Sequence, residues 1–203
     1  TGTLTENIMS VADVRSFTHT DALVTAALAS PKPEKGAHQN SFDAAILDAF
    51  GKANGRGIAS RKRVSETPFD AKVGFETVVV KHGEQVQTIM RGAPEAVVKH
   101  CTRMTAMQRK TVDLWIKEAG DQGRRVLAIA GKRLTRELSS SDALAMNGLT
   151  LYGLISFADP VKPSTFGAIK QAQALGMSIK ILTGDRPEVA AAVAVEIKLI
   201  EQS

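Results

Sequence analysis

The last quarter of the chain carries a helix–strand–helix pattern that constrains the fold more than any other part of the sequence. From Pro163 to Leu175, apolar residues recur at every third position, which predicts a helix with one apolar side. Gly176 follows where many helices end in a left-handed residue. The apolar run Ile179–Leu182 then predicts a short strand, and Pro187 predicts the first turn of another helix, reaching about residue 197. This order predicts half of a doubly wound α/β unit, which gathers its chemistry at the carboxyl ends of its strands.

Thr183, Gly184 and Asp185 directly follow the predicted strand. A hydroxyl, a glycine that lets a backbone amide approach closely, and a carboxylate together suit a phosphate and a magnesium ion. Alone, such a triplet is usually just a turn. Two further motifs give it weight: the chain opens Thr1-Gly2-Thr3-Leu4-Thr5, and Asp159-Pro160 follows a long apolar strand predicted at residues 149–157.

Taken together, these motifs resemble the cytoplasmic part of the P-type (E1–E2) cation-transporting ATPases. In that family an aspartate and a lysine precede the threonine that corresponds to Thr1, and the aspartate receives the γ-phosphate of ATP. Neither residue is in this chain, so the resemblance implies a piece cut just after the nucleophile. It also implies an α/β fold in which an α+β nucleotide-binding domain, an antiparallel sheet with flanking helices, occupies residues 9–158. This domain would be inserted into a partial haloacid-dehalogenase-like doubly wound domain formed by residues 1–8 and 159–203.

The middle of the chain resembles the nucleotide-binding domain of the same family. Strand-like runs at residues 77–80 and 86–90 predict a β-hairpin, with Pro68-Phe69-Asp70 before it and Arg91-Gly92-Ala93-Pro94-Glu95 after it. The resemblance implies that Phe69 stacks on the adenine, with Phe75 as a weaker alternative. Gly92 has no side chain, so it would let the backbone pass close to the ligand.

Charged residues complete the expected nucleotide site. Asp43 lies early in a helix predicted to be capped by Ser41, where a carboxylate also suits the helix dipole. The resemblance places Asp43 near the exocyclic amine of adenine and puts Arg91 where the family usually has lysine. Lys72 is a candidate phosphate contact, because Gly74-Phe75 occupies a place where relatives often carry a basic residue. Arg125, or else Arg124, would hold the phosphates from the start of the strand predicted at residues 126–130.

The resemblance also assigns the catalytic end of the site. Thr1, Thr183, Gly184 and Asp185 would contact the γ-phosphate and Mg²⁺, Thr1 through its main chain, and Asp159 would lie close to them at the hinge between the two domains. The expected ligands are ATP or ADP and Mg²⁺. The expected partners are the pump's own transmembrane and actuator domains, at the cytoplasmic face of a membrane. We expect the isolated piece to be monomeric and to bind nucleotide without turnover.

Composition limits the alternatives. The net charge of +5 favours anionic partners, but an aromatic content of 4% and short basic clusters argue against nucleic acid. Cys101 is the single cysteine, which excludes an internal disulfide. Further helices are predicted after Asp21, at residues 105–122 and near Ala143. A soluble haloacid-dehalogenase-like phosphatase with a large cap domain is the alternative function. The transported cation cannot be read from these residues.

Overall fold

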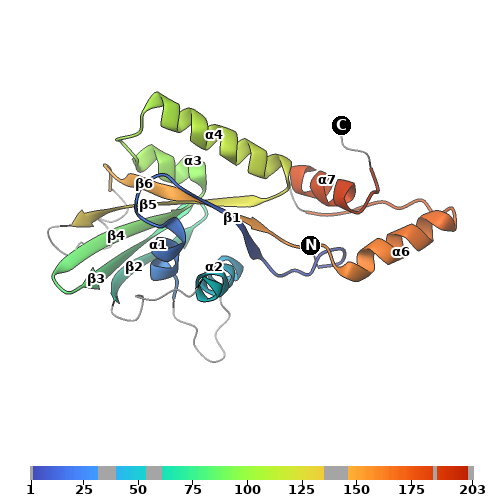
Figure 1. Ribbon diagram of the computed structural model, residues 1–203, viewed down its shortest axis with the longest axis horizontal. Coiled ribbons are helices and arrows are strands. Elements are labelled where there is room, and N and C mark those ends of the chain that lie inside the picture. The colour runs from blue at the N-terminus through green and yellow to red at the C-terminus, as the bar shows by residue number, and fades with distance from the viewer. Residues whose placement is uncertain (1, 32–39, 54–60, 135–145, 185–186, 201–203) are drawn as a thin grey trace.

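A six-stranded antiparallel sheet forms the body of the molecule, with the strand order β1-β6-β5-β4-β3-β2 (Figure 1). The computed structural model describes residues 2–31, 40–53, 61–134, 146–184 and 187–200. None of the helices in these ranges is long and apolar enough to cross a membrane. The strands are β1 (Ser10–Ser16), β2 (Lys62–Asp70), β3 (Phe75–His82), β4 (Gln85–Gly92), β5 (Arg125–Leu134) and β6 (Thr150–Ala158).

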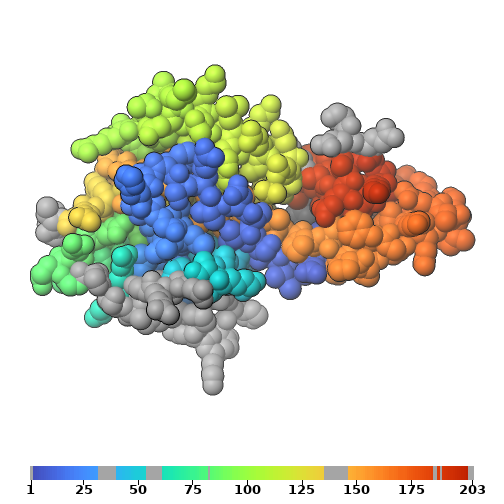
Figure 2. Space-filling model, viewed as in Figure 1, coloured from blue at the N-terminus to red at the C-terminus, as the bar shows by residue number. Residues whose placement is uncertain are grey.

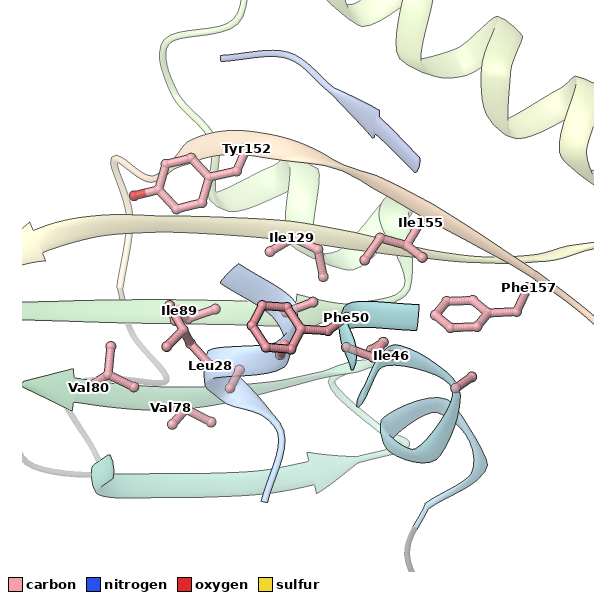
Figure 3. Packing of buried hydrophobic residues seen from close by; sticks show 14 residues of the cluster. Leu28, Ile46, Phe50, Val78, Val80, Ile89, Ile129, Tyr152, Ile155 and Phe157 are labelled. Carbon is pink, nitrogen blue, oxygen red and sulfur yellow. The ribbon is translucent and has the colours of Figure 1, made fainter. Parts of the chain in front are cut away.

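Helices α1 (Ala22–Ala29) and α2 (Ser41–Lys52) cover one face of the sheet (Figure 1). Asp21 caps α1 by accepting the backbone N–H groups of Leu23 and Val24, so the helix begins where the sequence predicts. Almost every side chain of α1 is buried, as expected for a helix that is apolar on all sides. Figure 3 shows the resulting core, in which side chains of α1 and α2 meet those of the strands: Leu28, Ile46, Phe50, Val78, Val80, Ile89, Ile129, Tyr152, Ile155 and Phe157.

The opposite face of the sheet is covered by α3 (Pro94–Val97), the 3₁₀ turn η1 (Val98–His100) and α4 (Ala106–Asp121). Thr105 and Gln108 form a reciprocal capping box at the start of α4, which fixes where this helix begins. Val112 and Ala119 are buried in the second core, and Trp115 packs against it. Cys101 is buried at the end of η1, and desolvation raises the pKa of its thiol to about 11. It therefore stays protonated at neutral pH.

The residues after β6 form a lobe beside the body (Figure 2), built from α6 (Pro163–Ala174) and α7 (Pro187–Glu196). Gly176, with φ of +73°, ends α6 in a Schellman motif, in which the N–H of Met177 bonds to the carbonyl of Ala172. A small third core joins Val161, Ile169 and Ile197.

The strand predicted at Ile179–Leu182 is not formed, so this part of the prediction is wrong. Ile179 and Ile181 pack against the third core, but the side chain of Leu182 is almost fully exposed. A strand needs a neighbour to bond, and all six strands in the described ranges belong to the antiparallel sheet. The α/β character is confirmed, while the doubly wound half stays a prediction.

Most other predicted elements are confirmed. The hairpin is β3–β4, the helix at residues 105–122 is α4, and the helices beginning at Pro163 and Pro187 are α6 and α7. The cap of α2 was misplaced by one residue, because the side chain of Asn40, rather than Ser41, accepts the N–H of Phe42. The helix predicted near Ala143 lies outside the described residues.

Candidate functional site

The residues predicted for the site gather at one end of the sheet. In an antiparallel sheet, the last residues of one strand lie beside the first residues of its neighbour, at the same end of the sheet. Phe69 and Asp70 end β2, Gly92 ends β4, and Asp159 follows β6. Arg125 begins β5 at this same end, because Arg125 pairs with Phe157 near the end of β6. A ligand lying across this end of the sheet could therefore contact residues that come from strands several positions apart.

Phe69 and Phe75, the two candidate stacking residues, differ sharply in exposure. The exposed fraction of Phe69 is 54%, whereas that of Phe75 is 5%. Phe75 lies in the second core, where its ring contacts the ring of His100 edge to face, with centroids 5.0 Å apart. The structure therefore excludes Phe75 as a stacking surface in this conformation and leaves the ring of Phe69 accessible.

Asp43 and Arg91 meet in a buried cluster of charges together with Glu76. Arg91 Nη2 lies 2.5 Å from Asp43 Oδ1 in an ion pair that lacks regular hydrogen-bond geometry. Arg91 Nε donates to Glu76 Oε1, and Nη1 donates to Ser30 Oγ at 2.8 Å and, more weakly, to the carbonyl of Ala26. These contacts fix the guanidinium between β3, α1 and α2. The resemblance predicted Arg91 and Asp43 at the base, but it did not predict that they would bind each other.

Gly92 has a structural reason to lack a side chain. A Cβ at this position would lie 2.3 Å from the carbonyl oxygen of Gly74 and 2.5 Å from Cα of Phe75. The close approach is thus made by the chain's own β3, the neighbour of Gly92 in the sheet. Lys72 lies in the exposed turn between β2 and β3, where its N–H donates to Asp70 Oδ1.

Asp159 ties together the two chain segments that were predicted to form the hinge. Thr5 Oγ1 donates to Asp159 Oδ2 at 2.7 Å, and the N–H of Ile8 donates to Oδ1 at 3.3 Å. Thr5 also forms an isolated antiparallel bridge with Val161. Lys162 Nζ donates to the carbonyl of Gly2 at 2.6 Å. The first residues of the chain and those following β6 are therefore held side by side.

A cavity of about 480 Å³ opens beside this hinge. Its polar lining includes Thr3, Arg125, Asp159 and Thr183, and its apolar lining comes largely from residues 179–182 and α7. Gly184 follows as an exposed residue, whereas Thr1 and Asp185 lie outside the described residues. The cavity brings the start of the chain, the hinge and the region of the Thr-Gly-Asp triplet together.

The described residues contain no group of three or more carboxylate, histidine or cysteine side chains that could hold a metal ion. Asp159 and Glu196 are carboxylates that line the cavity, and Asp159 already accepts two hydrogen bonds from the chain. The described donor set therefore does not amount to a magnesium site, and the predicted role of Thr1 lies outside the described residues.

Two residues of this region were missed by sequence reasoning. Thr5 belongs to the opening motif of the chain, and nothing local indicates its bond to Asp159, 154 positions away. Glu76 carried a weak signal, since it is an acidic residue within the apolar run of β3, on the alternating positions that also include Val78 and Val80.

The sequence is similar to known proteins along most of its length. A family model described as "P-type ATPase, cytoplasmic domain N" matches residues 13–164. Magnesium-transporting ATPase, P-type 1, of Escherichia coli (strain K12) is 33% identical over 177 residues, which are 79% of this chain and 19% of that protein. Probable cation-transporting ATPase I of Mycobacterium leprae is 28% identical over 225 residues, covering 98% of this chain and 14% of that protein. Sodium/potassium exporting P-type ATPase 1 of Saccharomyces cerevisiae is 28% identical over 166 residues. The chain spans about a fifth or less of the length of these relatives.

Proposed function

The chain belongs to the P-type cation-transporting ATPases, whose cytoplasmic N domain it contains, and from this premise we propose that it binds the ATP that such a pump consumes. The observation that carries the proposal is the ring of Phe69, which is exposed at the edge of the sheet beside a buried cluster of charges. An aromatic face of this kind suits a purine base, whereas a phenylalanine that only packs the core is sealed from solvent.

The phosphates of the nucleotide would extend from Phe69 along the same edge towards the hinge. Lys72 is exposed in the next turn, and Arg125 lines the hinge cavity with Asp159 and Thr183. Guanidinium groups bind phosphate oxygens in a fork geometry, which fits the predicted role of Arg125. Gly184 and, by the resemblance, Thr1 and Asp185 would complete the γ-phosphate end.

In the whole protein, ATP hydrolysis would proceed through an aspartyl phosphate and drive cation transport. The nucleotide-binding domain, residues 9–158, would bind ATP and close towards the phosphorylation domain by a hinge motion. We also propose that these 203 residues by themselves bind nucleotide without hydrolysing it.

The proposed partners follow from the same family role. They are ATP or ADP and the transmembrane and actuator domains of the same pump, at the cytoplasmic side of its membrane, with the N domain itself a monomer. The relatives transport different ions by their names, magnesium in one and sodium or potassium in another, so the cation is left open.

Titration with a fluorescent ATP analogue, followed by competition with unlabelled ATP, tests the proposal. Phe69→Ala removes the stacking surface and is expected to weaken ATP binding about tenfold, because base–aromatic stacking contributes roughly 1–3 kcal/mol. Phe166→Ala is the matched control, since Phe166 is also exposed but lies on α6. A wild-type protein without a saturable signal, or equal affinities of the two variants, would show that the site is not here.

A further inference from the structure

A second cavity, of about 280 Å³, opens at the opposite end of the sheet from the candidate nucleotide site. Arg61, just before β2, and Arg133, near the end of β5, line this cavity. The nucleotide site instead uses Phe69 near the end of β2 and Arg125 at the start of β5. Arg125 and Arg133 are eight positions apart along β5, so roughly 26 Å of extended strand separates them. The second cavity is therefore a separate site.

The register of the sheet brings polar side chains of this cavity onto one face. Arg133 pairs with Gln87, and Gln87 pairs with Val80. Val80 belongs to the core beneath α1, so the side chains of these paired positions share that face. Arg63 also pairs with Val80, and Arg61 stands two positions before Arg63 on the same face of β2. Side chains from β2, β4 and β5 thus meet beneath the start of α1.

Tyr152 brings a hydroxyl group into the cavity from a ring that is itself 8% exposed. In Figure 3 this hydroxyl points away from the core, at the end where Val80 lies. A Cβ at Gly131 would lie 2.9 Å from Cε2 of Tyr152, so the ring is seated against the bare backbone of β5. Gln87 Nε2 donates to the hydroxyl oxygen at 3.3 Å.

The hydroxyl group of Tyr152 is a free donor. Its own hydrogen is not donated to any of the described residues. Burial raises the pKa of Tyr152, so the phenol keeps this hydrogen at neutral pH. A ligand with an acceptor oxygen would therefore find an O–H group waiting in the cavity.

The charged side chains that line the cavity, within the described residues, are two guanidinium groups and one carboxylate. Neither Arg61 nor Arg133 has an ion-pair partner in the described part of the chain. The carboxylate belongs to Asp21, whose Oδ1 already accepts the N–H groups of Leu23 and Val24 as the cap of α1. The lining is therefore net positive, and its unused groups are hydrogen-bond donors.

We propose that this cavity binds a phosphate group, with the guanidinium groups of Arg61 and Arg133 and the hydroxyl of Tyr152 as its donors. Guanidinium groups bind phosphate oxygens in a fork geometry. The two positive charges match a phosphate dianion, and its tetrahedral oxygens serve donors that come from three different strands. A carboxylate has only two oxygens, in one plane. The proposal does not depend on nucleotide binding at Phe69.

The cavity is larger than a phosphate ion, and part of its lining is apolar. Val24 and Val86 lie in this lining beside the polar groups. A small organic part attached to the phosphate would cover these side chains. The ligand is therefore either a phosphorylated small molecule or the free ion, and the two sources share the same recognition chemistry.

Titration of the ¹⁵N-labelled protein with inorganic phosphate, followed by amide NMR, tests the site residue by residue. Saturable shifts are expected at the N–H groups of Gln87, Arg133 and Tyr152. Arg133→Gln is expected to weaken binding about tenfold, the effect of losing a hydrogen bond between charged groups. Tyr152→Phe keeps the ring and is expected to weaken binding about threefold. Lys62→Gln is the matched control, because it removes a positive charge beside Arg61 from an exposed residue that does not line the cavity.

Two further ligands identify the source and the chemistry of the bound group. Tighter binding of glycerol 3-phosphate than of inorganic phosphate at the same amides would assign a phosphorylated small molecule, and the reverse would assign the free ion. Both results support the site. Succinate is expected to bind at least about threefold more weakly than either, because each of its carboxylates leaves a donor unpaired. Equal or tighter binding of succinate would overturn the assignment to phosphate.

Other results would overturn the site itself. These are shifts that rise without saturating, or an effect of Arg133→Gln no larger than that of Lys62→Gln. If the amide spectrum shows that Arg133→Gln does not fold, Arg61→Gln, which precedes β2, makes the same test with the same expected loss. Shifts confined to the surroundings of Lys72 and Arg125 would place phosphate at the candidate nucleotide site alone, which refutes this proposal and leaves the proposed function standing.

Discussion

Arg91 and Gly92 are adjacent residues of one predicted motif, yet they have different structural roles. Arg91 holds two carboxylates and the end of α1, and it does so from inside the protein. Gly92 makes room for the backbone of Gly74 and Phe75. A motif matched by sequence therefore mixes residues that can meet a ligand with residues that let two strands pack closely, and only their surroundings tell them apart.

Gly92→Ala is expected to lower the free energy of unfolding by about 2 kcal/mol, the usual scale for overpacking a well-packed site. The added methyl group would lie 2.3 Å from a backbone oxygen, so β3 would have to move. Urea denaturation measures this. Gly51→Ala is the control, since nothing lies within 4 Å of a Cβ there and Gly51 is inside α2, where alanine is favoured by about 0.5–1 kcal/mol. Equal effects of the two substitutions would contradict the packing role of Gly92.

Sequence reasoning could name Phe69 and Phe75 as candidates, but it could not rank them by exposure. Both are aromatic residues at the junction of β2 and β3, and their difference arises because β2 has a bulge at Pro68-Phe69 while Phe75 points into the second core. The pairing of Arg91 with Glu76 could likewise not be predicted from the sequence, since it depends on the register between β3 and β4. Asp43, Arg91 and Phe69 could be named as candidates because their motifs are local.

At the scale of elements, patterns with a strong local signal were predicted well. Helix α4 has an apolar stripe and a capping box, and the β3–β4 hairpin has two apolar runs around a short turn. Strands β1 and β2 were not predicted, because their residues are mostly polar and most of their side chains are exposed or only partly buried. The strand at Ile179–Leu182 was predicted from apolar residues alone, although strand formation also requires a partner.

The capping box of α4 gives a prediction at this scale. Thr105→Ala removes the hydroxyl that accepts the N–H of Gln108 at 3.1 Å, and it is expected to lower the free energy of unfolding by about 1 kcal/mol. Thr111→Ala makes the same change inside the helix, where alanine's higher helix propensity is expected to raise stability by about 0.5 kcal/mol. Both values come from urea denaturation. A loss at Thr111 as large as that at Thr105 would mean that the cap contributes nothing specific.

At the scale of the whole molecule, the described residues form three separate cores. The two larger cores lie on the two faces of the sheet, and the third joins α6 and α7 to the start of the chain. The sheet connects to this third core through the segment before β1 and the segment after β6. The cavity of about 480 Å³ is lined by residues of both parts, which also meet where α7 packs against α4. Asp159 is central among these contacts, because it accepts hydrogen bonds from both Thr5 and Ile8.

Asp159→Ala is therefore expected to loosen the hinge and leave the sheet intact. A hydrogen bond to a charged group contributes roughly 1.5–3 kcal/mol, so amide hydrogen exchange in residues 2–8 should speed up about tenfold or more. The N–H groups of Glu6 and Lys162, which bond across the hinge to Pro160 and Leu4, report on the same opening. Asp13→Ala removes an exposed carboxylate on β1 that accepts the N–H of Val14, and it should leave exchange at the hinge unchanged. Exchange that rises equally in β3, β4 and β5 would show that the hinge and the sheet unfold as one unit, and unchanged exchange would show that Asp159 does not hold the hinge closed.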